Sequence, residues 1–396
     1  MSKNNNIIDS SFPYGWAFQD SDMPLTRNST AKKVIFFGND MATFTNMGVD
    51  ANSYINKCNE CLDYIRREFS GHDLIYKPHP ADKDERAALN LQDFKLVEDD
   101  TNAELFLFNN HNEVRAVFSL GSAACYSAYA MAFNSYVFYK LFNNILSDEL
   151  VRPLDEFYHD MPESFFVRSF SNDVSDNARV LKNDDGLKLL FNEILDKNSG
   201  KIWLVAFTVE YVVLLIALAK MIKNVDPNRS IGLIVSKHRY WDSLNSNFFK
   251  KYFDNVLVWP RINYSLRPTK LLQAVRLAYK IRKFKISQED IIISIAQNSF
   301  VENCLNSYNK KNTRIGLISG KDLNLFYNNQ NSIYQNNNNF RFSKASWFYN
   351  RIFEPILGLN RTTFMFYGLG GGSFITRYQK PLNEIFDKVV VLKAGE

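Results

Sequence analysis

The stretch VIFFGND, residues Val34–Asp40, decides the fold class, because a short apolar run that ends at a glycine is typical of the first strand of a parallel sheet. An amphipathic helix is expected next, over Ser53–Phe69, followed by a second strand over Leu74–Tyr76. The same order returns with strand Ala116–Phe118, helix Ala123–Phe133 and strand Tyr136–Tyr139. Strands and helices that alternate at these spacings predict a doubly wound parallel sheet.

A second series of the same kind begins at Ile202, after the polar stretch Asn172–Gly200. Its expected strands are Ile202–Phe207, Ser230–Val235, Val256–Val258, Asp290–Ile295 and Arg314–Ile318. A polar stretch between two such series is the usual place of a domain boundary, and 396 residues suit two domains. We therefore predict an α/β protein of two Rossmann-like domains, at residues 1–199 and 200–396.

A histidine between two prolines follows the second strand, in Tyr76–Pro80. The prolines restrict the backbone and remove donors, so the imidazole of His79 leaves the strand end in a defined direction. Strand alternation places Lys77 on the same side as His79. A structural histidine at a strand end and a solvated lysine are the alternatives.

Small residues follow the next strand, in Phe118–Ala124. Ser119, Gly121 and Ser122 lie where this strand would pass into a helix. A helix start offers N–H groups and the positive end of the helix dipole, which suit an anion. We predict that these residues and His79 hold a phosphate.

The His-Pro motif and the later serine-rich turn resemble the nucleotide-binding half of bacterial sialyltransferases, which use CMP-activated acidic sugars. The resemblance implies that His79, Ser119 and Ser122 contact the phosphate and ribose of CMP. It also implies that Glu98, between the two motifs, lies near the ribose or base. Such enzymes work without a metal, so no cofactor besides the CMP-sugar donor is expected.

The resemblance further implies a GT-B fold, in which two Rossmann-like domains face a cleft. The order of domains is reversed here, with CMP-sugar binding in residues 1–199 and acceptor binding in residues 200–396. The adjacent acids before a glycine that such enzymes carry are missing from Ile315–Asp322. Glu210 is the expected base or nucleophile, with Asp322 as second choice, although Glu210 equally suits the N-terminus of a helix.

The predicted function is therefore transfer of an acidic ulosonic sugar, of the sialic, pseudaminic, legionaminic or Kdo type, from CMP to a bacterial surface polysaccharide or lipid-linked glycan. One alternative keeps the fold and changes the donor to CDP-glycerol or a UDP or GDP sugar. Another is a catalytically silent glycan-binding or nucleotide-binding partner, which the missing acid pair favours.

The charge balance limits the class of partner. A net charge of +5 suits anionic substrates or an anionic membrane surface, but it is too small for a dedicated nucleic-acid binder. The segment Arg267–Lys285 is predicted to form a basic amphipathic helix that rests on anionic lipid. A solvated basic face is the alternative.

Other segments indicate a cytoplasmic protein, at most in peripheral contact with the inner face of the membrane. Four cysteines are too few for a disulfide framework, and Cys58 and Cys61 share a helical face rather than a metal site. The apolar run Ile202–Ile222 contains Glu210, so a buried strand and helix are favoured over a membrane span. The glycine-rich stretch Tyr367–Ser373 and the Asn-rich stretch Asn328–Asn339 are expected to be loops.

Overall fold

The computed structural model describes residues 7–18, 31–46, 48–79, 85–98, 101–171, 173–179, 181, 185–206, 211–237, 246–262, 266–295, 300–320, 348–359, 361–368, 371–378 and 385–394. The chain folds into two compact units. The five-stranded unit comprises Phe18–Asn183, Leu369–Gly371 and Lys393–Glu396. The seven-stranded unit comprises Met1–Ala17, Asp184–Gly368 and Gly372–Leu392.

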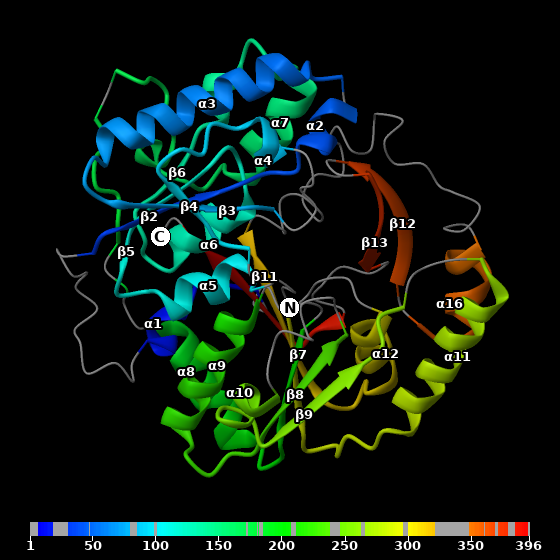
Figure 1. Ribbon diagram of the computed structural model, residues 1–396. Helices are drawn as coiled ribbons and strands as arrows, with labels where there is room; N and C mark the ends of the chain where they lie inside the picture. The colour runs from blue at the N-terminus through cyan, green and yellow to red at the C-terminus, as the bar shows by residue number, and fades with distance from the viewer. Residues whose placement is uncertain are drawn as a thin grey trace. The chain divides into compact units, whose positions relative to one another are not determined.

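The five-stranded unit is built on a parallel sheet in the order β4-β3-β2-β5-β6 (Figure 1). Its strands are β2 (Lys33–Phe37), β3 (Asp73–Lys77), β4 (Phe94–Leu96), β5 (Val114–Ser119) and β6 (Ser135–Val137). The chain runs outward from β2 to β4 and then returns to place β5 beside β2. The strand order therefore reverses between β2 and β5, the switch point of a doubly wound sheet.

Helices and short turns connect these strands. They are α2 (Met41–Asn46), α3 (Ala51–Glu68), α4 (Glu85–Ala88), α5 (Ala103–Asn109), α6 (Ala123–Ala130), η1 (Tyr139–Phe142), α7 (Asp148–Phe157) and η2 (Glu163–Phe165). The N-cap of α3 is Asp50, whose side chain accepts a hydrogen bond from the Ser53 amide at 2.8 Å. Cys58 and Cys61 are buried on the inner face of α3, which confirms the prediction from helical spacing.

The seven-stranded unit contains a sheet in the order β1-β14-β11-β10-β7-β8-β9. Its strands are β1 (Ile7–Ser11), β7 (Ile202–Ala206), β8 (Ile231–Ser236), β9 (Asn255–Trp259), β10 (Ile291–Ile295), β11 (Thr313–Ser319) and β14 (Lys388–Lys393). Every pair from β9 through β14 is parallel. The order reverses between β7 and β10, so the predicted fold class, two Rossmann-like parallel sheets, is confirmed.

The helices of this unit are α1 (Tyr14–Ala17), α8 (Asp185–Lys197), α9 (Val212–Val225), α10 (Ser246–Lys250), α11 (Pro268–Lys283), α12 (Phe300–Tyr308), the π-helical turn η6 (Tyr349–Phe353) and α16 (Glu354–Ile356). The apolar run after Ile202 forms β7 and α9, as predicted. Helix α9 is buried on almost every side, and Lys220 near its end donates to the Ala17 carbonyl at 2.7 Å. Within the described residues, no helix combines the length and apolarity needed to cross a bilayer.

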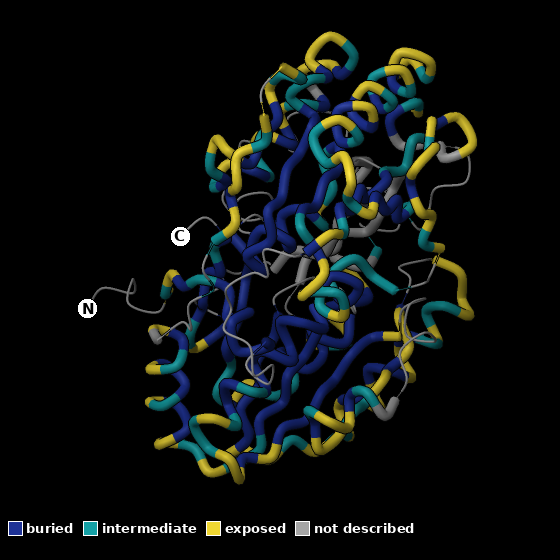
Figure 2. Tube along the Cα trace, turned by 60° about the vertical axis from the view of Figure 1, so that its left-hand side comes forward, coloured by how far each residue is buried: buried dark blue, intermediate teal, exposed yellow. Residues whose placement is uncertain are grey.

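In each unit, the central strands of the sheet are buried and the exposed segments lie on outer helices and turns. Figure 2 shows the buried strands in dark blue and the exposed segments in yellow. Parallel strands covered on both faces are apolar without alternation, which explains the continuous apolar runs of β7 and β8.

The structure divides the chain between Asn183 and Asp184, earlier than the predicted boundary at residue 200. Helix α8 belongs with the seven-stranded unit because it packs on α9, and its Leu187 and Phe191 are buried. The composition of the polar stretch could not reveal this, since the apolar face of α8 suits either neighbour.

The glycine-rich stretch also differs from its prediction. Gly368 ends strand β12 (Arg361–Gly368), and Gly371 begins β13 (Gly371–Tyr378), which pairs with β12 in a two-stranded sheet. The Asn-rich stretch Asn328–Asn339 lies outside the described residues.

Candidate functional site

The strands of the five-stranded sheet end at one edge in close register. Lys77 at the end of β3 pairs with Phe37 of β2, and Phe37 pairs with Ser119 at the end of β5. His79 and Gly121 each follow two residues beyond these paired positions. Since neighbouring strands lie about 4.8 Å apart, the two motifs emerge on either side of the switch point.

The turn after β2 brings two backbone segments close together. The Gly38 amide donates to the Lys77 carbonyl at 2.9 Å. A Cβ atom on Gly38 would lie 2.3 Å from Tyr76 Oη and 3.4 Å from the His79 amide nitrogen. Only glycine permits this approach, so the half-buried His79 is held beside the end of β2.

Ser122 is the N-cap of α6, and its Oγ accepts a hydrogen bond from the Ala124 amide at 3.2 Å. Its carbonyl oxygen accepts from Tyr158 Oη at 2.9 Å, which fixes the start of the helix. Gly121, just before it, has room, because an added Cβ would lie 3.4 Å from Leu154 Cδ2, an ordinary contact. The helix start therefore stands at the sheet edge with a residue of minimal volume in front of it.

Ser119, which the sequence places at the end of β5, is fully buried. Its side chain has no exposed surface, and its Oγ accepts a hydrogen bond from the Ser122 amide at 2.9 Å. The hydroxyl also hydrogen-bonds to the buried thiol of Cys125, whose pKa burial raises to about 11. Ser119 therefore shapes the turn that presents Ser122.

Lys77 is buried rather than solvated, with 5% of its surface exposed. Its Nζ lies 5.2 Å from the ring centroid of Phe106 in α5, a cation–π contact. Glu98 follows β4 at the same edge of the sheet and is exposed. The alternative of a solvated Lys77 is therefore wrong, because α5 covers that face of the strand.

Both acids predicted for the acceptor domain, Glu210 and Asp322, lie outside the described residues. Among the described residues, no group of three histidine, cysteine or acidic side chains is placed to hold a metal ion.

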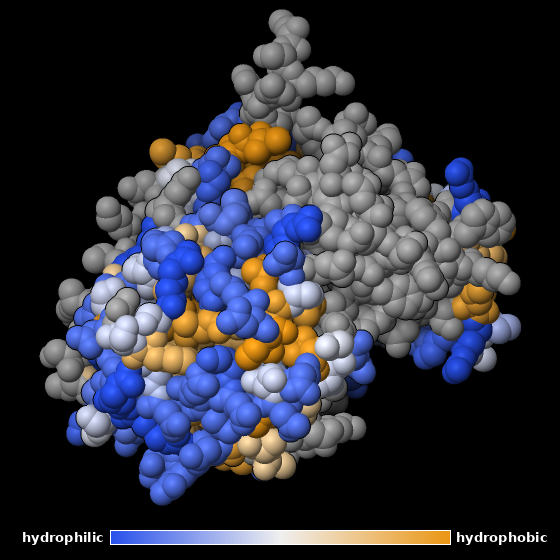
Figure 3. All heavy atoms as spheres, turned by 90° about the horizontal axis from the view of Figure 1, so that it is seen from above, coloured by the Kyte–Doolittle hydropathy of each residue, from blue (hydrophilic) through white to orange (hydrophobic). Residues whose placement is uncertain are grey.

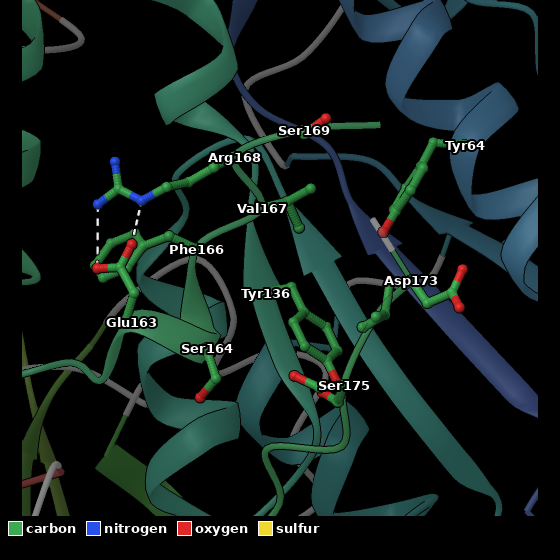
Figure 4. Close-up of a pocket in the computed structure, with 11 residues that line it drawn as sticks. Tyr64, Tyr136, Glu163, Ser164, Phe166, Val167, Arg168, Ser169, Asp173 and Ser175 are labelled. Atoms are coloured by element: carbon green, nitrogen blue, oxygen red, sulfur yellow. Dashed lines mark hydrogen bonds and ion pairs between the residues drawn. The ribbon is translucent and has the colours of Figure 1, made fainter. Parts of the chain in front are cut away.

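A cavity of about 240 Å³ opens elsewhere in the five-stranded unit, beside β6 (Figure 4). Arg168 and Glu163 form a two-point ion pair on one side of it, and this pair lowers the pKa of Glu163. Burial, with a smaller contribution from nearby charges, raises the pKa of Tyr64 to about 12. Sequence reasoning missed this cavity because α3, β6 and the segment 163–175 are far apart along the chain. It does not coincide with the edge that carries His79.

Comparisons with known proteins add little. No protein-family model matches the sequence, and no curated protein matches it. Among solved structures, several variants of the wall teichoic acid polymerase TagF show a weak similarity. A histidine-to-alanine variant has a TM-score of 0.17 and 10% identity over 76% of this chain and 73% of that chain. A histidine-to-asparagine variant soaked with CDPG has a TM-score of 0.18 and 11% identity over 77% of this chain and 74% of that chain. TM-scores this low carry no argument about this protein.

Proposed function

We propose that this protein is a glycosyltransferase that moves an acidic ulosonic sugar, of the sialic, pseudaminic, legionaminic or Kdo type, from a CMP donor to a bacterial surface polysaccharide or lipid-linked glycan. One observation carries the proposal: His79 and the capped start of α6 lie at the same edge of a parallel sheet, on either side of its switch point. Doubly wound sheets bind their ligands at that place.

The chemistry of the donor explains why these groups suit it. As the bond from sugar to phosphate breaks, negative charge grows on the departing CMP. The imidazole of His79 and the N–H groups at the start of α6 would stabilise that charge without reorganising. Ser119 would act by holding the turn before Ser122.

The remaining residues of the donor site act less directly. Lys77, desolvated below the edge, would add a positive field rather than a contact. The exposed Glu98 would face the ribose or base. We propose no metal and no further cofactor, since imidazole, hydroxyl and amide donors suffice for this leaving group.

The acceptor would bind in the seven-stranded unit. Glu210, four residues after the end of β7, is the proposed base or nucleophile, and Asp322 is the second choice. A lipid-linked acceptor would bring the protein to the cytoplasmic face of the membrane.

Calorimetric titration with CMP, CDP, UDP and GDP tests the donor. The proposal expects CMP to bind, His79→Ala to weaken that binding, and His72→Ala to leave it unchanged, because His72 precedes β3 at the opposite edge of the sheet. Preference for CDP would point to a CDP-glycerol donor, and preference for UDP or GDP to another sugar donor.

Release of CMP from CMP-sugars tests the reaction itself. Wild-type protein is expected to release CMP, and Glu210→Gln to slow the release. Binding of CMP without release from any CMP-sugar would indicate a silent binding partner.

A further inference from the structure

One face of the seven-stranded unit combines exposed apolar and basic side chains on α11. Leu272, Val275 and Tyr279 are 49%, 41% and 59% exposed. Their spacing of three and four residues places them on one side of the helix. The opposite side, which includes Leu277 and Ile281, is buried in the core of the unit. We call the exposed side the α11 face.

All charged residues of α11 are basic. The cations of the helix are Lys270, Arg276, Lys280, Arg282 and Lys283, and the helix contains no acidic residue. In the part of the chain that the structure describes, no ion pair neutralises any of these five cations. Lys283 instead lies with its Nζ 4.4 Å from the ring centroid of Tyr279. Positive charge and apolar surface are therefore interleaved.

A basic cavity of about 690 Å³ adjoins the end of this helix. Arg282, Lys310 and Lys311 line it, together with the turn that follows α16, and no acidic residue does. Tyr308 Oη donates to the Leu357 carbonyl at 2.9 Å and so ties this turn to α12. The cavity is thus a cationic hollow with a wall anchored to the core.

Apolar side chains stand at the mouth of the cavity. Ile356 of α16 lines it and is 78% exposed, and Ile352, one helical turn earlier, is 37% exposed. In Figure 3, orange atoms beside dark blue ones occupy the right-hand end of the view, where α11 and α16 lie in Figure 1. A large aliphatic side chain held in water beside cations is costly unless an apolar medium receives it.

We propose that the α11 face and this cavity form a docking surface for an anionic phospholipid bilayer. The phosphate of one lipid headgroup enters the cavity between Arg282, Lys310 and Lys311. Ile356 and the apolar residues of α11 enter the interfacial layer, and the other cations of α11 attract the surrounding anionic lipid. The charge complementarity and the exposed aliphatic side chains together favour a lipid surface over a nucleic acid, which would leave Ile356 in water. The inference does not depend on the identity of the sugar donor.

Sedimentation of the full chain with vesicles tests the surface. Vesicles of phosphatidylcholine alone are expected to bind weakly, and vesicles that also contain phosphatidylglycerol to bind tightly, with the binding lost at high salt. The triple variant Arg282→Gln, Lys310→Gln, Lys311→Gln is expected to bind anionic vesicles roughly 100-fold more weakly, because each cation at such a surface contributes about fivefold.

The matched control removes three exposed lysines elsewhere, with Lys95→Gln, Lys250→Gln and Lys251→Gln. It changes the net charge equally and should retain most of the binding. Equal losses in the two triple variants would overturn the cavity assignment, because bulk charge would then explain the attraction.

Ile356→Ser separates insertion from electrostatic attraction. A weaker affinity of this variant at unchanged charge supports insertion, and wild-type affinity overturns it. An unfolding midpoint equal to that of the wild type in all three variants would show that they remain folded, whether or not CMP binds. Unchanged CMP titration would show that the docking surface acts independently of the donor site. Tight binding of the wild type to phosphatidylcholine alone would exclude a role for the basic cavity.

Discussion

The two sheets share their strand order, and the surroundings of their glycines show where each sheet is tightly packed. In the seven-stranded unit, neighbouring atoms fill the space beside two glycines. A Cβ added to Gly200 would lie 2.2 Å from the Glu289 carbonyl oxygen, and a Cβ added to Gly232 would lie 2.4 Å from Trp203 Cε3. At the edge of the five-stranded sheet, a Cβ on Gly121 would meet nothing closer than 3.4 Å. A side chain at Gly200 or Gly232 would clash, whereas a Cβ on Gly121 would make only ordinary contacts with Leu154 and Tyr139.

The proposed role of the five-stranded sheet edge in CMP release depends on His79. We expect His79→Ala to lower the rate of CMP release about 100-fold to 1000-fold, the usual cost of removing one group that stabilises developing charge. The unfolding midpoint should stay close to wild type, since the side chain is only half-buried. Steady-state kinetics on His79→Ala and His72→Ala measure the difference. Comparable rates of CMP release in the two variants would contradict a catalytic role for His79.

The tight packing of the seven-stranded unit is tested at Gly200. Gly200→Ala should destabilise the protein by about 3 kcal/mol, because the clashing atoms belong to the backbone at Glu289 and Asp290 and cannot rotate away. Gly121→Ala should stay within about 1 kcal/mol of wild type while weakening CMP binding. Urea unfolding of both variants measures the contrast, which disappears if the two lose equal stability.

Stability at alkaline pH probes the interior beneath the edge of the five-stranded sheet. The Cys125 thiol has its pKa raised by burial from 9.0 to about 11, so between these values the unfolded chain loses a proton that the native state keeps. Native stability therefore falls as pH rises through this window, by up to about 3 kcal/mol. Cys125→Ala should flatten this part of a plot of unfolding free energy against pH, and a slope identical to wild type would contradict the assignment.

The smallest expected effects separate the two serines of the turn. Ser122→Ala should cost about 1 kcal/mol through the lost N-cap and should also weaken CMP binding. Ser119→Ala should cost a similar amount by leaving the Ser122 amide without its acceptor, and it should affect binding only through that turn. Titration with CMP measures the difference: wild-type affinity in Ser119→Thr, which keeps the hydroxyl that accepts from the Ser122 amide, together with weaker binding in Ser119→Ala would support this division of roles.

Most of the architecture was predictable from the sequence because covered parallel strands are short and continuously apolar. The expected strand Leu74–Tyr76 lies within β3, and the expected helix Ser53–Phe69 matches α3 to within two residues at each end. The expected helix start at Ala123 is confirmed, and Ser122 before it is the N-cap.

What could not be predicted depends on contacts between distant segments. Strand alternation places Lys77 on one face of the sheet, but it does not say that α5 covers that face. The motif around Ser119 places a hydroxyl at a strand end, but it does not show that this hydroxyl accepts a hydrogen bond from the Ser122 amide. Helix α8 has an apolar face that suits either unit, and only its packing on α9 decides between them.

The sequence by itself determined two series of parallel strands and the position of a histidine and a capped helix after two of them. Local preferences, such as apolar periodicity, proline geometry and helix capping, act over a few residues and can be read in order along the chain. Only the tertiary structure decided which side chains at the sheet edge remain accessible to solvent. Strand register and the helices that cover the sheet bring together residues that are far apart in sequence. Ser122 was left at the edge, whereas Ser119 and Lys77 were enclosed.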